Sequence, residues 1–384
     1  MANLVQARQR INEIDDEILA LMHERLDVAS QVAAAKLEQH KAIFDPARER
    51  EELLRLARAS DPNRTAYTVS LFRLLMSMNK AEQAQLMAQH KPQQTPRSEQ
   101  VAQALKTYDT PFPSMIRVVC QGTEGSNSQR AAERLVHLPQ LSFEKSFEAV
   151  CEAVHEGKAE LGILPIENST AGSVTAVYDL LTRFNFSIVR SLRMRIDHAL
   201  LAHPGTKLED IRTVYSHPQA LAQCARFLAK HSIQALTAEN TAMAAERVAH
   251  DARRDIAAVA SASCAELYGL EAVATEIQDA PGNYTRFVAI SDTAQIYPGA
   301  HRSSLMVVLR HEPGALYRVL ERLYALDINL VKLESRPIPG HDFEFAFYFD
   351  LECPAPSSAL NRLLDSLDDV CSYVHYLGSY REVV

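Results

Sequence analysis

The sequence predicts a multidomain chain in which an all-α helical bundle precedes a two-lobed α/β domain and a small α+β domain. A length of 384 residues suggests two or three domains of roughly 150 residues each. Residues 1–90 contain no glycine, whereas residues 116–292 alternate short apolar runs with helical stretches. Residues 300–384 follow a βαββαβ order, which is the ferredoxin-like arrangement. The intervening residues 91–115 are rich in Pro, Gln, Thr and Ser and predict a linker with one short helix in it.

Composition excludes several classes of function. The formal charge is −8, from 40 Lys and Arg against 48 Asp and Glu, which argues against a protein that mainly binds nucleic acid. No apolar run approaches the ~20 residues that span a bilayer. The six cysteines form no C-x-x-C pair, and the sequence contains no H-E-x-x-H, G-x-S-x-G, G-x-G-x-x-G or Walker motif. We therefore expect a cytoplasmic enzyme without metal or cofactor, and without nucleic-acid or membrane partners.

Three helices are expected in residues 1–90. The first is about 35 residues long, so it should pack in a bundle or a dimer. Asp45 before Pro46 is an N-cap and first-turn signal for a second helix, and Asp61 before Pro62 begins a third. Apolar residues recur along the first helix at helical spacing: Leu4, Ile11, Ile14, Ile18, Leu21, Val28 and Val32.

Strands and helices alternate through the second segment. Helical runs such as Ser128–Leu135 and Thr241–Ala252 separate the expected strands. This alternation predicts a mainly parallel sheet, and the segment is long enough for two lobes with a cleft between them. The expected strands are Ile116–Cys120, Leu161–Ile166, Ser187–Arg190, Thr213–Tyr215, Ile256–Ala260 and Phe287–Ile290.

Three cations lie on or beside the apolar stripe of the first helix. On a helical wheel Arg25 and Lys36 fall within about 20° of the centre of the stripe, and Arg8 falls about 80° away. One such cation is more often held by an ion pair or reaches solvent, but burying an unpaired cation costs several kcal/mol. Several cations on one face favour an internal site for an anion, whose lining Glu49 and Gln83 could complete.

The length of this helix constrains that site. Arg8 and Arg25 are 17 residues apart, which corresponds to roughly 25 Å along a helix, so a small metabolite cannot touch both within one chain. An antiparallel partner helix would bring its own Arg8 towards this Arg25. The pattern predicts a homodimer, or a higher even oligomer, with shared active sites.

The first segment resembles the all-helical chorismate mutase family. That family rearranges chorismate to prephenate in a pericyclic reaction, which needs only a held conformer and stabilised charge. Asn79 stands where many relatives have Ser, and an amide can replace a hydroxyl as donor or acceptor. The resemblance rests on six polar residues, with these spacings, on three helices: Arg8, Arg25, Lys36, Asp45, Glu49 and Gln83.

This resemblance implies a role for each residue. Arg8 of a partner chain and Arg25 would hold the two substrate carboxylates. Lys36 and Gln83 would reach the ether oxygen that gains negative charge, and Glu49 would take the ring hydroxyl. Lys36, Gln83 and Glu49 are therefore the expected catalytic residues. Two further residues are expected in the substrate site, Asp45 and Asn79.

Small polar residues follow four strands of the second segment. The Gly- and Ser-rich loop 121–128 leads into a helix whose N-terminus favours an anion, although a capped helix after a tight turn explains it equally well. A Glu–Asn pair within 165–172 lies where α/β clefts bind ligands. In 215–219, Ser216 is more simply a helix cap, and 284–287 enters a strand after a loop.

Taken in this order, Pro-Ile-Glu-Asn-Ser, Ser-His-Pro-Gln, Tyr-Gly-Leu at 268–270 and Thr-Arg-Phe resemble the prephenate dehydratase domain over residues 116–292. That family has two α/β lobes, as periplasmic binding proteins do, with the active site in the cleft. Prephenate there loses CO2 and its ring hydroxyl together to give phenylpyruvate, and aromatisation drives the reaction. The enzyme mainly orients the dianion and supplies a hydrogen-bond donor to the leaving oxygen.

The dehydratase resemblance assigns the donor role to Thr285 and a carboxylate contact to Arg286. Asn127 stands where relatives mostly carry an aromatic ring, and Cys120–Gln121 replaces their Leu–Gly. We therefore expect different substrate packing in this first loop and the same reaction. The resemblance also implies a pocket lined by Ser126, Ser128, Glu167, Asn168, Ser216 and Gln219.

The last segment contains Gly314-Ala-Leu316 and Glu334-Ser-Arg-Pro337. These two motifs resemble the ACT regulatory domain, which is fused to prephenate dehydratases and binds phenylalanine between two chains. One begins a helix at 314–316, and the other ends a strand at 334–337. A plain ferredoxin-like dimerisation module is the alternative, but the presence of both motifs favours a ligand. The expected allosteric phenylalanine site comprises Gly314, Ala315, Leu316, Glu334, Ser335 and Arg336.

Two other interpretations of the whole chain stay open. A non-catalytic metabolite sensor would use the cleft and the ACT module without chemistry, but Thr285 and the cations of the first helix are retained. A weaker alternative keeps the dehydratase and treats the helical bundle as a dimerisation element. The favoured interpretation is a bifunctional enzyme of phenylalanine biosynthesis, with chorismate and prephenate as substrates and phenylalanine as a feedback inhibitor.

Overall fold

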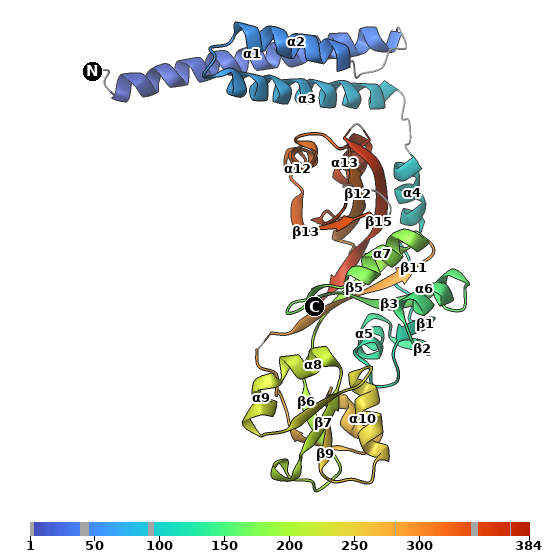
Figure 1. Cartoon of the computed structure of the whole chain (residues 1–384). Coiled ribbons are helices and arrows are strands. Elements are labelled where there is room, and N and C mark those ends of the chain that lie inside the picture. The colour runs from blue at the N-terminus through green and yellow to red at the C-terminus, as the bar shows by residue number, and fades with distance from the viewer. Residues whose placement is uncertain (1–3, 39–45, 91–95, 281, 339–344, 369) are drawn as a thin grey trace. The chain divides into compact units, whose positions relative to one another are not determined.

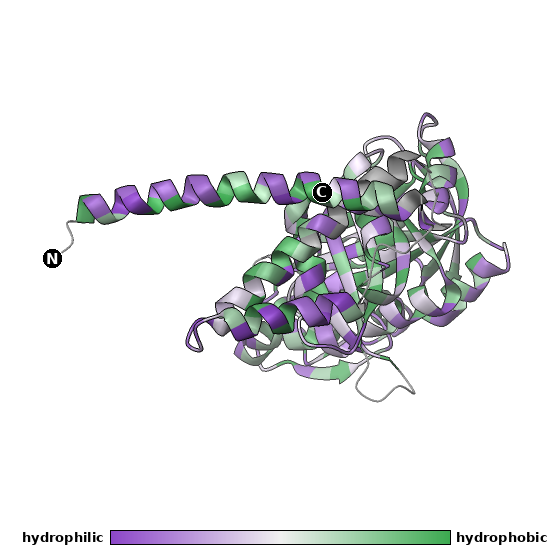
Figure 2. Ribbon diagram, turned by 90° about the horizontal axis from the view of Figure 1, so that it is seen from above, coloured by the Kyte–Doolittle hydropathy of each residue, from purple (hydrophilic) through white to green (hydrophobic). Residues whose placement is uncertain are grey.

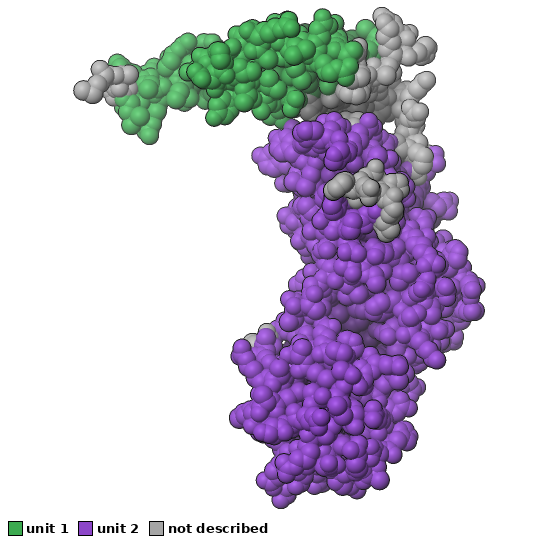
Figure 3. All heavy atoms as spheres, in the orientation of Figure 1, with its two compact units in different colours: residues 1–95 green, residues 96–384 purple. Residues whose placement is uncertain are grey.

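The computed structural model divides into two compact units, residues 1–95 and residues 96–384 (Figure 3). Among the described residues, no helix is both long and apolar enough to cross a membrane. The residues that the structure describes are 4–38, 46–90, 96–280, 282–338, 345–368 and 370–384.

The first unit consists of the three expected helices, α1 (Leu4–Glu38), α2 (Pro46–Ala59) and α3 (Thr65–His90) (Figure 1). The third helix begins after residue 64, later than expected, because the Asp61 carboxylate accepts the backbone N–H of Asn63 and closes a turn first. Hydrophobic residues recur along α1 among polar ones (Figure 2). Several members of this apolar stripe are exposed in the single chain, including Ile11, Ile14, Ile18 and Leu21.

In the second unit, the first lobe is a mixed sheet. The strands β1 and β3 are parallel, as are β1 and β2, but β11 is antiparallel to both β3 and β5. The expectation of a mainly parallel sheet is therefore wrong for this lobe. The chain leaves the lobe after β5 and returns in β11, which runs opposite to both of its neighbours. Its strands are β1 (Met115–Gln121), β2 (Leu138–Glu144), β3 (Leu161–Asn168), β4 (Gly172–Ser173), β5 (Ser187–Arg195) and β11 (Tyr284–Ser291), with helices α5 (Asn127–Leu135), α6 (Phe147–His155) and α7 (Thr175–Phe184).

The second lobe is a separate five-stranded sheet in the order β10-β6-β9-β7-β8. The chain enters it after β5 and returns to the first lobe before β11. Figure 3 shows the surface hollowed where the two lobes meet. The elements of this lobe are β6 (Ala199–Ala202), β7 (Thr213–Ser216), α8 (Pro218–Gln223), α9 (Ala225–Lys230), β8 (Gln234–Thr237), α10 (Thr241–His250), β9 (Ile256–Ala260), α11 (Ser263–Tyr268) and β10 (Glu271–Ala274).

The C-terminal domain has the expected βαββαβ chain order, with strands arranged β13-β14-β12-β15. Its last strand continues past the domain and pairs in parallel with β5, so both sheets form one hydrogen-bonded sheet. Gly378 permits this passage, because a Cβ there would lie 2.4 Å from the Ile188 carbonyl oxygen of β5. The elements are β12 (Arg302–Leu309), α12 (Ala315–Ala325), β13 (Asn329–Pro337), β14 (Phe345–Glu352), α13 (Ser358–Ser366) and β15 (Cys371–Val383).

Part of the expected linker belongs to this C-terminal domain. Residues 96–104 form the helix α4 (Pro96–Ala104), whose Val101 and Ala104 are buried in the hydrophobic core of the domain. Arg97 forms an ion pair with Asp368. The short helix expected within the linker is α4, and its apolar face packs in the core of the C-terminal domain.

Candidate active sites

Two polar side chains meet where the central strands of the first lobe end. Thr285 of β11 lies directly opposite Asn168 of β3 in their antiparallel register. The Asn168 Nδ2 donates to Thr285 Oγ1 over 2.9 Å, and both side chains are buried. Because the threonine oxygen accepts this bond, its own hydrogen can be donated to a bound ligand. The pair therefore presents a neutral, oriented hydroxyl donor.

The orientation of the Asn168 amide is fixed. Its Oδ1 accepts hydrogen bonds from the backbone N–H groups of Thr170 and Ala171, at 3.0 and 2.9 Å. Its Nδ2 donates to Asn283 Oδ1 at 2.8 Å as well as to Thr285. Since two backbone donors determine which end of the amide is the oxygen, the nitrogen must face the threonine.

The amide network continues into the second lobe. Asn283 donates from Nδ2 to Gln223 Oε1 at 3.1 Å, and the same oxygen lies 2.9 Å from His198 Nε2. Burial lowers the pKa of His198, so the ring is neutral at neutral pH and its Nε2 is the donor to Gln223. His198 and Asn283 lie on the two chain segments that connect the lobes. The network thus ties the hydroxyl of Thr285 to both lobes.

The loop before α5 also contacts the second lobe. Ser126 caps α5 by accepting the backbone N–H of Gln129 at 3.3 Å, so the helix-cap interpretation of this residue is confirmed. Tyr268 donates its hydroxyl to the Glu124 carbonyl at 2.8 Å. A Cβ at Gly125 would lie 3.0 Å from the Cys264 sulfur, so glycine is what allows this close approach. Two buried serines, at positions 126 and 128, lie at the start of the helix.

In the third motif, residues 215–219, the residue that caps the helix is not the one we expected. His217, and not Ser216, caps α8, because its side chain accepts the backbone N–H of Gln219. Ser216 is fully buried and donates its hydroxyl to the Val259 carbonyl of the neighbouring strand β9. Gln219 is exposed in the first turn of α8. The helix-cap interpretation of Ser216 is therefore wrong.

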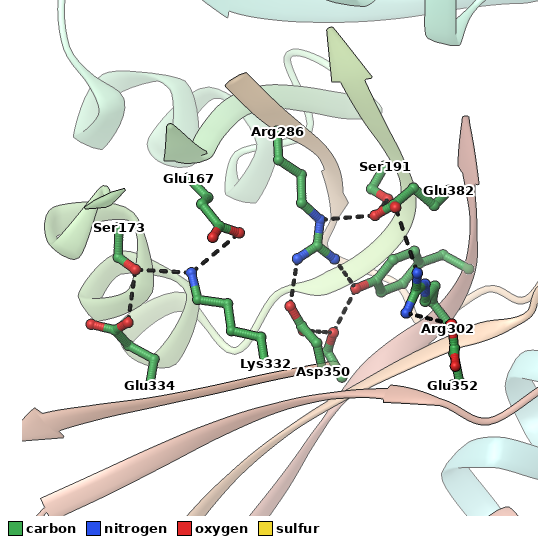
Figure 4. A network of polar contacts seen from close by, with 12 residues as sticks. Glu167, Ser173, Ser191, Arg286, Arg302, Lys332, Glu334, Asp350, Glu352 and Glu382 are labelled. Carbon is green, nitrogen blue, oxygen red and sulfur yellow. Dashed lines mark hydrogen bonds and ion pairs between the residues drawn. The ribbon is translucent and has the colours of Figure 1, made fainter. Parts of the chain in front are cut away.

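Arg286 points away from Thr285. Successive residues of a strand face opposite sides of a sheet, and the Arg286 side chain, 8% exposed, lies against the C-terminal domain. It forms ion pairs with Asp350 and Glu382 and donates to the Tyr380 hydroxyl at 2.7 Å (Figure 4). Burial opposes its charge, but Tyr380 and the two carboxylates outweigh it and raise the pKa of Arg286 well above its ordinary value. We expected this guanidinium to contact a substrate carboxylate, but it faces the C-terminal domain and not the side of the sheet that carries the Thr285 hydroxyl.

Glu167 lies on the same far side. Its carboxylate forms an ion pair with Lys332 of β13 at 3.2 Å, and Lys332 also donates to the Ser173 hydroxyl at 2.9 Å (Figure 4). A cavity of about 100 Å³ between the first lobe and the C-terminal domain is lined by Glu167, Lys332 and Arg286, among other residues. The expected pocket residues are thus divided, with Asn168 beside the threonine and Glu167 behind it.

The helical bundle brings four of its expected site residues to the interface of α1 and α3. Arg25 donates to the Leu75 carbonyl at 2.9 Å, and burial lowers its pKa. Lys36 Nζ donates to Oε1 of the buried Gln83 at 3.4 Å, which directs the amide NH2 of Gln83 elsewhere. The Asn79 Oδ1 is buried and has no hydrogen-bond partner among the described residues.

The remaining expected residues of the bundle are not brought together with these four. Arg8 is exposed near the start of α1, and Glu49 is half-buried in the first turn of α2. Because α1 is one uninterrupted helix, Arg8 and Arg25 of one chain stay roughly 25 Å apart. Asp45 lies outside the described residues.

The two motifs of the C-terminal domain occupy different faces. Gly314 has a φ of 80° and precedes α12, and Ala315 is buried. Glu334 of β13 accepts a hydrogen bond from Ser173 of the first lobe at 2.8 Å. Arg336 pairs with Asp179 of α7 at 3.4 Å. Leu316 packs at the edge of the domain core, and Ser335 lies on the strand face opposite Glu334 and Arg336.

Comparison with known proteins agrees with this division of the chain. A family model for chorismate mutase type II matches residues 7–84, and one for prephenate dehydratase matches residues 118–295. The bifunctional chorismate mutase/prephenate dehydratase of Escherichia coli (strain K12) is 31% identical over 98% of this chain and 96% of its own length. The chain belongs to this bifunctional family.

Other members of the dehydratase group are also similar to this chain. Arogenate dehydratase/prephenate dehydratase 2, chloroplastic, of Arabidopsis thaliana is 37% identical over 70% of this chain and 73% of its own length. The prephenate dehydratase of Arthrobacter aurescens, solved in complex with L-Phe, is 29% identical with a TM-score of 0.63. That similarity covers 69% of this chain and 89% of the solved one.

Membership in the chorismate mutase/prephenate dehydratase family confirms the expected pair of enzyme activities. It disfavours both the non-catalytic sensor and the bundle as a dimerisation element only. The sequence analysis did not identify three residues that extend the hydrogen-bond network of Asn168 and Thr285: Asn283, Gln223 and His198. Asn283 lies two residues before the threonine, and strand alternation places both on one face. No spacing in the sequence pointed to Gln223 or His198.

Proposed function

We propose that the Asn168–Thr285 pair carries the dehydration of prephenate, with residues 116–292 as the dehydratase domain. The bond from the ring to its carboxylate breaks and releases CO2, and that electron pair aromatises the ring. The ring C–O bond breaks as hydroxide leaves, and the Thr285 hydroxyl donates a hydrogen bond to the departing oxygen. The fixed amide of Asn168, which makes the threonine oxygen an acceptor, supports this role.

The dianion itself would lie between the lobes. Ser126 and Ser128 stand at the N-terminus of α5, where backbone N–H groups favour a carboxylate. Ser216 and Gln219 would line the second lobe at α8. Glu167 and Arg286 would act from behind the strands and not touch the substrate, because their partners are in the C-terminal domain.

Replacing Asn168 with aspartate tests the direction of this hydrogen bond. An aspartate oxygen would accept the Thr285 hydroxyl hydrogen, so the donor would face the wrong way. We expect dehydratase turnover to fall by about 100-fold, in the range of a lost positioned proton donor, with mutase turnover unchanged. Turnover near the wild-type value would show that the Thr285 hydrogen is not the donor. The measurement is phenylpyruvate formation from prephenate.

For the mutase we propose that residues 1–90 hold chorismate in its compact conformer. Arg8 of a partner subunit and Arg25 would bind the two carboxylates, with Asn79 and Asp45 contributing to the substrate site. Lys36 and the amide NH2 of Gln83 would donate to the ether oxygen as its bond to carbon breaks and the new carbon–carbon bond forms. Glu49 would accept the ring hydroxyl. The Lys36–Gln83 hydrogen bond supports this pairing, because it orients the amide.

We further propose that the chain works as a homodimer or higher even oligomer through α1. The exposed stripe supports this, since Ile11 is 56%, Ile18 55% and Leu21 63% exposed in a single chain. A second copy of the helix would cover the stripe and supply the missing Arg8.

A mixing experiment tests the shared site. Arg8→Ala and Arg25→Ala chains should each be nearly inactive as mutases. After unfolding and refolding together in equal amounts, half of the dimers are mixed and each has one intact site, so about a quarter of wild-type turnover should return. Each variant refolded alone is the control. If mixed dimers form and no activity returns, the two arginines do not serve one site.

We propose that residues 300–384 form an ACT-type module that binds phenylalanine at Gly314–Leu316 and Glu334–Arg336. Binding there would inhibit the dehydratase from a distance. The βαββαβ order and the two motifs support this proposal, as does the L-Phe complex of the similar Arthrobacter aurescens enzyme. The two motifs occupy different faces of the domain, which fits a ligand bound between two chains that each contribute one motif. We also propose a cytoplasmic location.

A further inference from the structure

One carboxylate of the proposed phenylalanine site is already engaged in this structure. Glu334 Oε2 accepts the Ser173 hydroxyl at 2.8 Å (Figure 4). The Ser173 oxygen accepts a second bond from Lys332 Nζ at 2.9 Å, and Lys332 pairs with Glu167 at 3.2 Å. Four polar side chains therefore connect β13 of the C-terminal domain to β3 and β4 of the first lobe.

Glu334 points away from the other half of the proposed ligand site. Glu334 is paired with Tyr348 across β13 and β14, and paired residues share a face of the sheet. Tyr348 is buried in the core formed with the first lobe, whereas Val319 of α12 is buried in the core on the opposite face. Glu334 therefore faces the first lobe, and to contact the ammonium group of a ligand bound between two chains its carboxylate must exchange the Ser173 hydroxyl for that group.

Ser173 belongs to the hairpin that orients the dehydratase donor. It pairs with Glu167, and Gly172 pairs with Asn168, across the two short arms of this β3–β4 hairpin. The turn between the arms supplies the two backbone N–H groups that hold the Asn168 Oδ1. The hydroxyl of Ser173 is thus anchored to the C-terminal domain on one side and to the support of Asn168 on the other.

We propose that Ser173 couples phenylalanine binding to dehydratase turnover by competing for the Glu334 carboxylate, an inference that rests on the proposed phenylalanine site. An ammonium ion is a stronger partner for a carboxylate than a neutral hydroxyl. Phenylalanine therefore binds better to the state in which Glu334 has left Ser173, which is the difference in affinity that any allosteric ligand needs. In that state the hairpin keeps the contacts of Lys332 with Ser173 and Glu167 but loses its bond to Glu334, and the Asn168 amide holds Thr285 less firmly as a donor.

Ser173→Ala in the full chain tests the competition, with two readouts that move in opposite directions. Without its competitor, Glu334 is free for the ligand, so the Kd for L-phenylalanine should fall by on the order of fivefold. Because the bonds of Ser173 are already absent, dehydratase turnover without phenylalanine should be lower than in the wild type, and saturating phenylalanine should inhibit the remaining turnover less. A merely damaged fold would weaken binding as well as inhibition. Kd is measured by titration calorimetry and turnover by phenylpyruvate formation.

Two further variants complete the experiment. Ser142→Ala removes a hydroxyl that, among the described residues, donates to the Val118 carbonyl inside the first lobe, and it should leave both readouts unchanged. Ser173→Thr keeps the hydroxyl and should retain wild-type coupling. A Kd that is unchanged or raised in Ser173→Ala, or full inhibition despite tighter binding, would overturn the coupling role. A wild-type chain that binds no phenylalanine would instead reject the phenylalanine site itself.

Discussion

Replacing Lys36 with alanine should lower mutase turnover by about 100-fold or more, the usual cost of losing a group that stabilises transition-state charge. Two losses combine in this variant. The ammonium that faces the developing charge on the ether oxygen disappears, and the Gln83 amide loses the donor that orients it. Dehydratase turnover should persist, because the Asn168–Thr285 pair lies in the other unit. The measurement is the loss of chorismate.

Arg10→Ala is the matched control for Lys36→Ala. Arg10 is another cation of α1, but its side chain is exposed and pairs with Glu13 on the same helix. Removing such a surface pair should leave mutase turnover within about twofold of the wild type, since exposed pairs contribute little. If Lys36→Ala stayed within a few-fold of the wild type, as Arg10→Ala should, the proposed anion site would be wrong.

Thr285→Ala is expected to depress dehydratase turnover by about 100-fold while mutase turnover survives. The substitution removes the hydroxyl and one methyl group and leaves the Asn168 Nδ2 facing the vacated position. Thr285→Ser keeps a hydroxyl at the same position and should retain most of the turnover. The comparison is made from kcat and KM for prephenate, and the loss should fall on kcat.

The serine variant separates chemistry from packing. Thr285 is 9% exposed, so a packing role of its methyl group would make both substitutions costly. Equal losses in Thr285→Ala and Thr285→Ser would indicate that the methyl group matters and the hydroxyl does not.

Much of the fold follows from local patterns in the sequence. The 35 residues of α1 repeat their apolar positions at helical spacing, and the βαββαβ order of the last domain shows in its apolar runs. The strands β2, β4, β6, β8 and β10 were missed. Four of them have only two to four residues, and β2 contains Pro139, which argues against a strand. The antiparallel placement of β11 was missed for another reason. Pairing partners far apart in the sequence leave no local signal.

The candidate sites were predictable in part. Asn168 and Thr285 were named separately from motifs, but their pairing depends on the register of β3 and β11. Strand alternation alone would have placed Arg286 on the face opposite Thr285. What no local pattern could show is that the C-terminal domain covers that face and supplies Asp350 and Glu382. The family resemblance identified the candidate residues, and the fold showed which face of the sheet each side chain occupies.

The central claim is that one chain carries two separable active sites in series. It is tested most directly by supplying chorismate to the wild-type, Lys36→Ala and Thr285→Ala chains and following chorismate, prephenate and phenylpyruvate with time. The wild type should consume chorismate and release phenylpyruvate. Thr285→Ala should accumulate prephenate, Lys36→Ala should leave chorismate unused, and the two variants mixed should release phenylpyruvate again. If either single variant lost both activities while remaining folded, or if the mixture released none, the two sites would not be separable as proposed.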